Sequence, residues 1–101
     1  MIVMLKYGIG RQVVVPVPVD FLNRLNGHSV QEGIQDLLDH VATDPERTVP
    51  VLRDAASDPR SVIEVRTDAG YQPLERTMPL KALLREQKTV EILVSRPHAG
   101  G

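Results

Sequence analysis

Residues 1–19, MIVMLKYGIGRQVVVPVPV, decide the fold, because they contain two β-rich stretches separated by a turn. Residues 1–7 are rich in apolar side chains, and Gly8 and Gly10 follow them, as is typical of a hairpin turn. In residues 12–19 every odd-numbered residue is a valine, which gives a strand one apolar face. The sequence therefore predicts that the chain opens with an antiparallel hairpin.

Pro16 and Pro18 lie within the second of these strands, and proline cannot donate a hydrogen bond to a β ladder. Residues of the same parity direct their backbone groups to the same side of a strand. The two prolines therefore remove donors from one side only, while Val13, Val15 and Val17 keep theirs for pairing with the first strand. We expect the second strand to be an edge of the sheet.

A helix is predicted to begin after Ser29, because the sequence Ser-Val-Gln-Glu at residues 29–32 has the spacing of a capping box. Gly33 lies in this helix, and we expect it to permit a close contact between the helix and the sheet. Apolar residues recur at helical spacing over about three turns, which predicts one buried face. This apolar face consists of Val30, Ile34, Leu37, Leu38 and Val41. The opposite, solvated face consists of Gln31, Gln35, Asp36 and Asp39.

Residues 43–60 contain three Xaa-Pro steps, and proline disfavours the helical conformation in the residue before it. We therefore expect an irregular connection here, with a short central strand at residues 49–52. The alternation of residues 61–67 predicts a third long strand. A turn at residues 68–70 and a short strand at residues 71–74 are expected to follow.

The rest of the chain predicts a short helix and a last strand. Residues 77–79 start a helical turn, and residues 89–95 form the last strand. Three leucines of the helical turn are expected to face inward: Leu80, Leu83 and Leu84. The predicted order is thus hairpin, helix, strand, short strand, helical turn, strand and tail.

This order is that of the β-grasp fold, and the sequence resembles ubiquitin and its relatives over nearly the whole chain. Residues 1–11, MIVMLKYGIGR, resemble the family's first strand and turn. Residues 69–75 resemble the turn before its fourth strand, and residues 89–94 resemble its last strand. The diglycine Gly100-Gly101 completes the resemblance.

The resemblance implies an α+β fold of the β-grasp type, in which a mixed sheet of four to five strands packs on one main helix. A short helical turn is expected before the last strand. The domain is then expected at residues 1–95, with a flexible diglycine tail at residues 96–101. The chain departs from the family in a longer approach to the helix at residues 20–28 and in an insertion at residues 43–60.

Composition argues against several classes of function. The 101 residues include 12 basic and 13 acidic ones, spread along the chain, so no basic surface for nucleic acid is expected. The two tyrosines and one phenylalanine are too few to stack bases. The longest apolar run, residues 2–5, is too short for a membrane span or a signal peptide. We expect a monomeric, cytoplasmic protein that binds neither nucleic acid nor membrane.

Enzymatic and metal-binding groups are also not predicted. The chain has no cysteine, which excludes a thiolate metal site, a disulfide and a thiol nucleophile. His28, His40 and His98 lack the paired spacing of metal ligands, and His40 is expected to interact with the C-terminal dipole of its helix. No combination of serine, histidine and acid indicates nucleophilic catalysis, so we expect no enzyme activity.

The resemblance implies a chemical role for the tail. In this family other enzymes adenylate the C-terminal carboxylate with ATP, pass it on as a thioester and join it to an amine or hydroxyl of a target protein. A peptidase then removes it, and the modifier itself needs no cofactor. Here the reacting end is Gly100 and Gly101, since residues without a Cβ let the backbone lie close to the walls of a narrow channel. The residues expected to be recognised by the activating enzyme are Arg96, Pro97, His98 and Ala99.

Two further sets of residues are candidates. Side-chain alternation places Met4 and Leu93 on the outer face of the two central strands, as an exposed apolar patch for partner enzymes. The three lysines, Lys6, Lys81 and Lys88, are the possible side-chain acceptors if the protein forms chains.

Two other functions remain open. A sulfur carrier, similar to the carriers of thiamine and molybdopterin synthesis, would hold a thiocarboxylate at Gly101. A β-grasp binding module would have an idle tail. The longer helix approach and the insertion favour the modifier, and nine arginines against three lysines favour a bacterial source, as in the ubiquitin-like proteins of bacterial conjugation operons.

Overall fold

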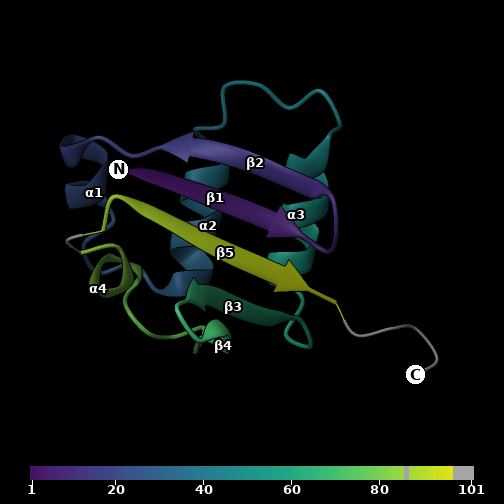
Figure 1. The fold of residues 1–101 in the computed structure, drawn as a ribbon. Helices are drawn as coiled ribbons and strands as arrows, with labels where there is room; N and C mark the ends of the chain where they lie inside the picture. The colour runs from purple at the N-terminus through teal and green to yellow at the C-terminus, as the bar shows by residue number, and fades with distance from the viewer. Residues whose placement is uncertain (86, 97–101) are drawn as a thin grey trace.

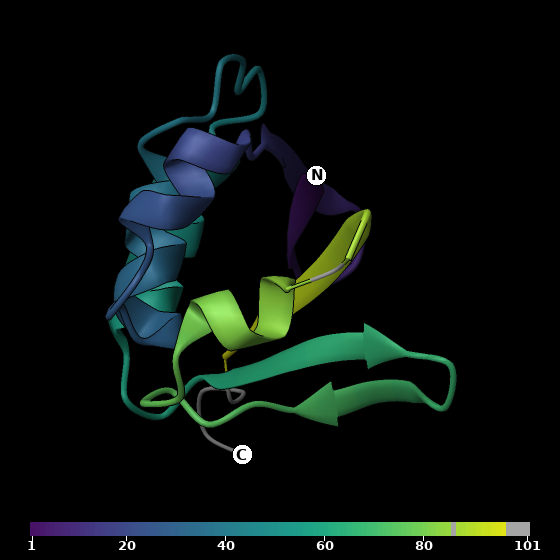
Figure 2. The same cartoon turned by 90° about the vertical axis from the view of Figure 1, so that its left-hand side faces the viewer.

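A computed structural model describes residues 1–85 and 87–96 of the chain, and residues 86 and 97–101 lie outside the described part. The described residues form a small α+β fold, in which helices cover one face of a five-stranded mixed sheet (Figures 1 and 2). The elements are β1 (Ile2–Tyr7), β2 (Arg11–Pro16), α1 (Val19–Arg24), α2 (Val30–Leu38), α3 (Thr48–Ser57), β3 (Val62–Thr67), β4 (Gly70–Pro73), α4 (Leu80–Leu84) and β5 (Thr89–Ser95).

The strands lie in the order β2-β1-β5-β3-β4, with β1 and β5 parallel and the other neighbours antiparallel. The predicted hairpin and the predicted edge position of its second strand are both confirmed. Val17 donates to the Met1 carbonyl at 2.8 Å, as expected for an odd-numbered residue of this strand. The strand is shorter than predicted, because Pro18 caps α1 and Val19, predicted to be on the apolar face, is exposed in its first turn.

The core lies between the sheet and the helices. Alternation in the strands determines which side chains enter it, as predicted for β1 and β5. The sheet contributes Val3, Leu5, Val13, Val15, Ile63, Val65, Val90, Ile92 and Val94. The helices contribute Phe21, Leu25, Val30, Ile34, Leu37, Leu38, Leu52, Ala55, Ala56, Leu80 and Leu84. The described helices include none that is long and apolar enough to cross a membrane.

The predicted start of α2 is confirmed in detail. Ser29 Oγ accepts a hydrogen bond from the Glu32 amide at 3.2 Å, and Glu32 Oε1 accepts one from the Ser29 amide at 3.3 Å. The predicted apolar stripe is buried except for Val41, which lies beyond the helix and is half-buried. A capping box is a local signal, so it can be recognised without knowledge of the tertiary structure.

The prediction for residues 43–60 was wrong, because they contain α3 and no strand at residues 49–52. The carboxylate of Asp44 accepts hydrogen bonds from the amides of Thr48 and Val49, at 2.7 and 2.8 Å. Pro50 lies in the first turn, where an amide has no partner within the helix, so its missing N–H costs nothing. The prolines were therefore misinterpreted as helix breakers.

The close contact expected at Gly33 exists, but it is with α4 and not with the sheet. A Cβ at this position would clash with Leu80 Cδ2 and would lie 3.0 Å from Leu80 Cβ. Two hydrogen bonds hold the segments together: Val30 donates to the Met78 carbonyl at 2.8 Å, and Leu80 donates to the His28 carbonyl at 3.0 Å.

The face of α2 that was predicted to be solvated also contacts neighbouring segments. Asp36 pairs with His28, and Asp39 pairs with Arg53 of α3. Gln35 Nε2 donates to the Arg53 carbonyl at 3.0 Å. These contacts link α2 to α3 and to the segment after α1, two neighbours that the sequence did not predict.

Candidate functional site

Arg96 is the one predicted tail residue among the described residues, since Pro97, His98, Ala99, Gly100 and Gly101 lie outside them. Arg96 directly follows β5, and its side chain is 35% exposed. Its Nη2 lies 2.6 Å from Asp54 Oδ2, and its Nε lies 3.9 Å from Asp58 Oδ2. The ion pair with Asp54 raises the pKa of Arg96. The predicted recognition residue is therefore held against the C-terminal end of α3.

Asp58 is itself held in place. Its carboxylate accepts hydrogen bonds from the Arg60 amide at 2.9 Å and from Arg60 Nε at 3.3 Å. These hydrogen bonds, the one from the Arg60 side chain foremost, lower the pKa of Asp58, and the charge of Arg96 adds to the effect. The backbone carbonyl of Asp58 accepts from Arg76 Nη2 at 2.5 Å. Sequence reasoning did not identify Asp54 or Asp58, because it assigned their segment to an irregular connection.

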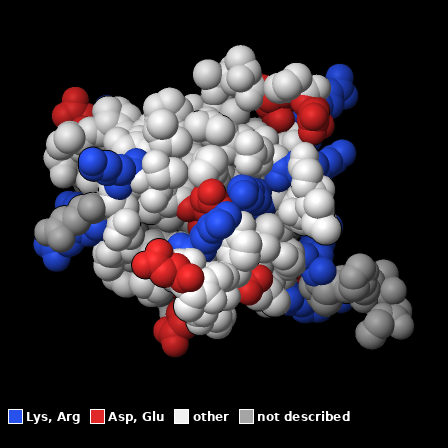
Figure 3. Space-filling model, in the orientation of Figure 1, with Lys and Arg blue, Asp and Glu red and all other residues white. Residues whose placement is uncertain are grey.

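The predicted patch residues, Met4 and Leu93, lie next to charged side chains on the outer face of the sheet. Met4 and Leu93 lie on this face as predicted, but both are half-buried. The register places Met4 beside Glu91 and Lys6 beside Leu93, so an ion pair of Lys6 and Glu91, 3.2 Å apart, separates the two apolar side chains. Figure 3 shows acidic and basic side chains together in the middle of this face.

Glu91 is the centre of that charged group. Arg66 Nη1 and the Tyr71 hydroxyl each lie 3.4 Å from its Oε2. Partial burial is the largest single influence and favours a raised pKa at Glu91, but the hydrogen bonds and charges of Lys6 and Arg66 together outweigh it, and the pKa is lowered. The side chains of this charged group therefore pair with one another on the outer face of the sheet.

The apolar part of the outer face lies closer to the β2 edge. Ile2 and Val14 are 44% and 46% exposed, and Met4 pairs with Val14 across β1 and β2. Ile2 pairs in the same way with the exposed Pro16. The signal in the sequence was Val14 itself, an apolar residue at an even position in a strand whose odd positions face the core.

The three lysines differ in their surroundings. Lys6 is 25% exposed on its side chain, and the hydrogen bond to Glu91 raises its pKa. Lys81 is half-buried on α4, whereas Lys88 is exposed just before β5. An amine must lose its proton before it attacks a carbonyl, so the ion pair with Glu91 makes Lys6 less reactive as an acceptor.

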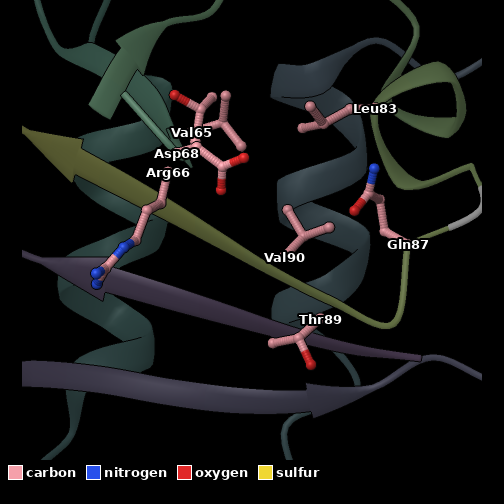
Figure 4. Close-up of a pocket in the computed structure, with 8 residues that line it drawn as sticks. Val65, Arg66, Asp68, Leu83, Gln87, Thr89 and Val90 are labelled. Atoms are coloured by element: carbon pink, nitrogen blue, oxygen red, sulfur yellow. The ribbon is translucent and has the colours of Figure 1, made fainter. Parts of the chain in front are cut away.

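A hollow of about 450 Å³ lies between β3, α4 and the start of β5. It opens because the pairing of β3 with β5 ends at Val65 and Ile92, and the strands then separate. Leu83 and Gln87 lie on one side of it, and Val65 and Asp68 on the other (Figure 4). The remaining lining residues are Arg66, Thr67, Thr89 and Val90. This lining includes no cysteine, histidine or lysine that could serve as a nucleophile or base.

The two described histidines, His28 and His40, each contact a side chain of a helix. Among residues 1–85 and 87–96, no group of three or more His, Cys, Asp and Glu side chains is placed to hold a metal ion. His28 pairs with Asp36, and His40 Nδ1 lies 3.0 Å from the Asp36 carbonyl near the end of α2. The His40 ring also packs edge-to-face on Phe21, with ring centroids 4.1 Å apart. Both histidines thus tie α2 to the α1 segment.

Comparisons with protein-family models, with curated proteins and with solved structures gave no match. The function is therefore inferred from the residues of this chain and their arrangement.

Proposed function

We propose that the chain is a β-grasp protein of the ubiquitin-like type and acts as a protein modifier through the Gly101 carboxylate. The observation that carries the proposal is the strand order β2-β1-β5-β3-β4, with β1 and β5 parallel at the centre and α2 placed between β2 and β3 in the chain. A β-grasp domain has this order. The diglycine after β5 then stands where the reactive end of such modifiers stands.

The chemistry requires little from the body of the protein. An activating enzyme joins the Gly101 carboxylate to the α-phosphate of ATP and releases pyrophosphate, and a cysteine thiolate of the enzyme then displaces AMP to give a thioester. A target amine or hydroxyl attacks that thioester and releases the thiol. This division of labour agrees with a small domain whose outer sheet face exposes the apolar side chains of Ile2 and Val14 for docking.

The proposed partners are an activating enzyme, a conjugating enzyme, a deconjugating peptidase and a protein target. The proposed setting is the cytoplasm of a bacterium. Arg96 is proposed as a contact of the activating enzyme, since it is the cation at the base of the tail. Lys88 is preferred over Lys6 as an acceptor in chains, because Lys6 is paired with Glu91.

The test is the intact mass of the protein recovered from its native cells, with Gly101→Ala and a deletion of Gly100-Gly101 as controls. We expect discrete high-mass adducts with an isopeptide or ester bond at Gly101, and we expect both controls to lack them. A mass change equal to the exchange of one oxygen for sulfur would instead indicate the sulfur carrier. An unmodified chain under every condition would leave the binding module.

A further inference from the structure

Arg96 is fixed by the segment in which the chain departs most from its proposed family. Asp54 belongs to the last turns of α3, and Asp58 is the residue that caps it. Both carboxylates approach the Arg96 guanidinium, one at 2.6 Å from Nη2 and the other at 3.9 Å from Nε. The insertion at residues 43–60 therefore supplies the contacts of the last residue described before the diglycine end.

One of the two carboxylates belongs to a rigid part of the molecule. The Asp58 side chain is 15% exposed and is held by the Arg60 amide. Arg76 donates to three backbone carbonyls at the end of α3, with 2.8 Å to Ala56, 2.5 Å to Asp58 and 2.8 Å to Ser61. Since a guanidinium has its donors in a fixed plane, these three bonds define the position of the helix end.

The other carboxylate is exposed. The Asp54 side chain is 74% exposed, and its contact with Arg96 is the shorter of the two. This ion pair is therefore accessible to water. Exposed ion pairs of this kind contribute little to stability. Their effect is to select one orientation of a long side chain, and an arginine held by two carboxylates still has donors left for a third group.

We propose that Asp54 and Asp58 are positioning residues, which hold the Arg96 guanidinium at the end of α3 so that the activating enzyme binds it in one fixed orientation. This inference rests on the proposed modifier function. The fitting surface of that enzyme carries an acceptor for the remaining Arg96 donors. An enzyme that recognised Arg96 as an isolated charge would be indifferent to Asp54 or would bind better without it.

The first experiment measures whether the ion pair exists in solution. In the ¹⁵N-labelled full chain, the Arg96 Nη–H protons are compared between the wild type, Asp54→Asn and Asp54→Glu, with Asp20→Asn on α1 as a matched control. We expect faster exchange of these protons with water in Asp54→Asn, because Asp54 contacts Nη2, and wild-type behaviour in Asp54→Glu and in the control. Equal exchange in all four proteins would contradict the positioning role.

The second experiment measures the Gly101-dependent adducts in native cells. We expect Asp54→Asn to lower their yield by about 5-fold or more, because misplacement of a contact residue is costly, and Asp54→Glu to restore it. The double variant Asp54→Asn with Arg96→Gln should be no worse than Arg96→Gln alone, since the two residues act as a unit. An undiminished yield in Asp54→Asn, or additive losses in the double variant, would overturn the inference.

The two failures can be told apart. If the wild type forms no adduct that depends on Gly101, the modifier function fails, and the inference that rests on it fails too. If such adducts form equally well with and without the Asp54 carboxylate, the modifier function stands and the positioning role alone is rejected.

Discussion

Helices α2 and α3 pack side by side on the same face of the sheet (Figures 1 and 2). The sequence signals that mark the start of each helix are very different. The N-cap of α2 and its partner are three residues apart, Ser29 and Glu32, and an apolar stripe follows. In α3 the cap is Asp44, and the residue before the helix, Arg47, has a left-handed backbone with φ of 54°. Because Asp44 accepts hydrogen bonds from amides four and five residues later, the start of α3 does not have the spacing of a capping box.

The two helices nevertheless have the same relation to the core. Leu37 of α2 and Leu52 of α3 are both fully buried, and Gln35 and Arg53 join the helices through hydrogen bonds. The difference teaches that the strength of a local signal and the contribution to the core are independent.

Truncation of the two buried leucines should destabilise the protein about equally. Leu52→Ala and Leu37→Ala are each expected to lower the free energy of unfolding by about 2–5 kcal/mol, through lost burial and the cavity left behind. Urea denaturation measures both. If α3 were a dispensable insertion, Leu52→Ala would cost less than about 0.5 kcal/mol, as a surface substitution does.

A substitution at Gly33 tests the close contact between α2 and Leu80 of α4, which has no counterpart described for α3. Gly33→Ala is expected to destabilise by about 1–2 kcal/mol, because the clash with the buried Leu80 outweighs the gain in helix propensity. In a Leu80→Ala background the same change should be much less harmful. An equal cost in both backgrounds, measured by urea denaturation, would place the origin of the loss elsewhere.

The two caps should have similar energies in spite of their different spacing. Asp44→Ala and Ser29→Ala are each expected to cost about 0.5–2 kcal/mol, because each removes the acceptor of first-turn amides. Native-state hydrogen exchange locates the effect: faster exchange should be found in α3 for Asp44→Ala and in α2 for Ser29→Ala. Fast exchange spread over the whole sheet in either variant would contradict a local cap.

The smallest expected effect is a pH dependence of the α2 cap. Hydrogen bonds from the Ser29 hydroxyl and then the Ser29 amide lower the pKa of Glu32 below its ordinary value of 4.5. A lowered pKa stabilises the folded state above the unfolded pKa, and this stabilisation is lost as the pH falls through the folded pKa. The urea midpoints of the wild type and Glu32→Gln should therefore differ at neutral pH and converge as the pH falls through the lowered pKa of Glu32.

A control separates this cap from general charge effects. Glu46 is an exposed glutamate in the loop before α3, so Glu46→Gln removes one negative charge at a different helix. The pH-dependent difference should be present for Glu32→Gln and smaller for Glu46→Gln. A larger pH dependence for Glu46→Gln would reverse the assignment of the titrating group to α2.

Much of the sheet was predictable, because its signals repeat along the chain. The last strand was predicted at residues 89–95, where β5 lies, and β3 and β4 begin within one residue of their predicted starts. Alternation also placed Met4 and Leu93 on the outer face of the sheet. Short segments without repeats were missed: α1 has six residues, and Phe21 is its one buried residue, too little for a periodic pattern.

The candidate site was predictable only by residue type. The sequence indicated Arg96 as a contact residue and Met4 and Leu93 as surface residues, but their neighbours come from distant segments. Asp54 lies in a helix that was not predicted, and Glu91 lies between the two apolar residues because of the register of β1 and β5. Pairing across the sheet and packing of α3 decide these contacts.

The sequence by itself determined the hairpin, the edge strand, the capped helix α2 and the last strand, because each depends on residues close together in the chain. The tertiary structure alone decided that Asp44 caps α3, that Gly33 makes room for Leu80, and that Arg96 rests on the end of α3. The physical reason is that a single carboxylate or a missing methyl group has no periodicity. Such groups gain a role only when folding brings their partners within contact distance.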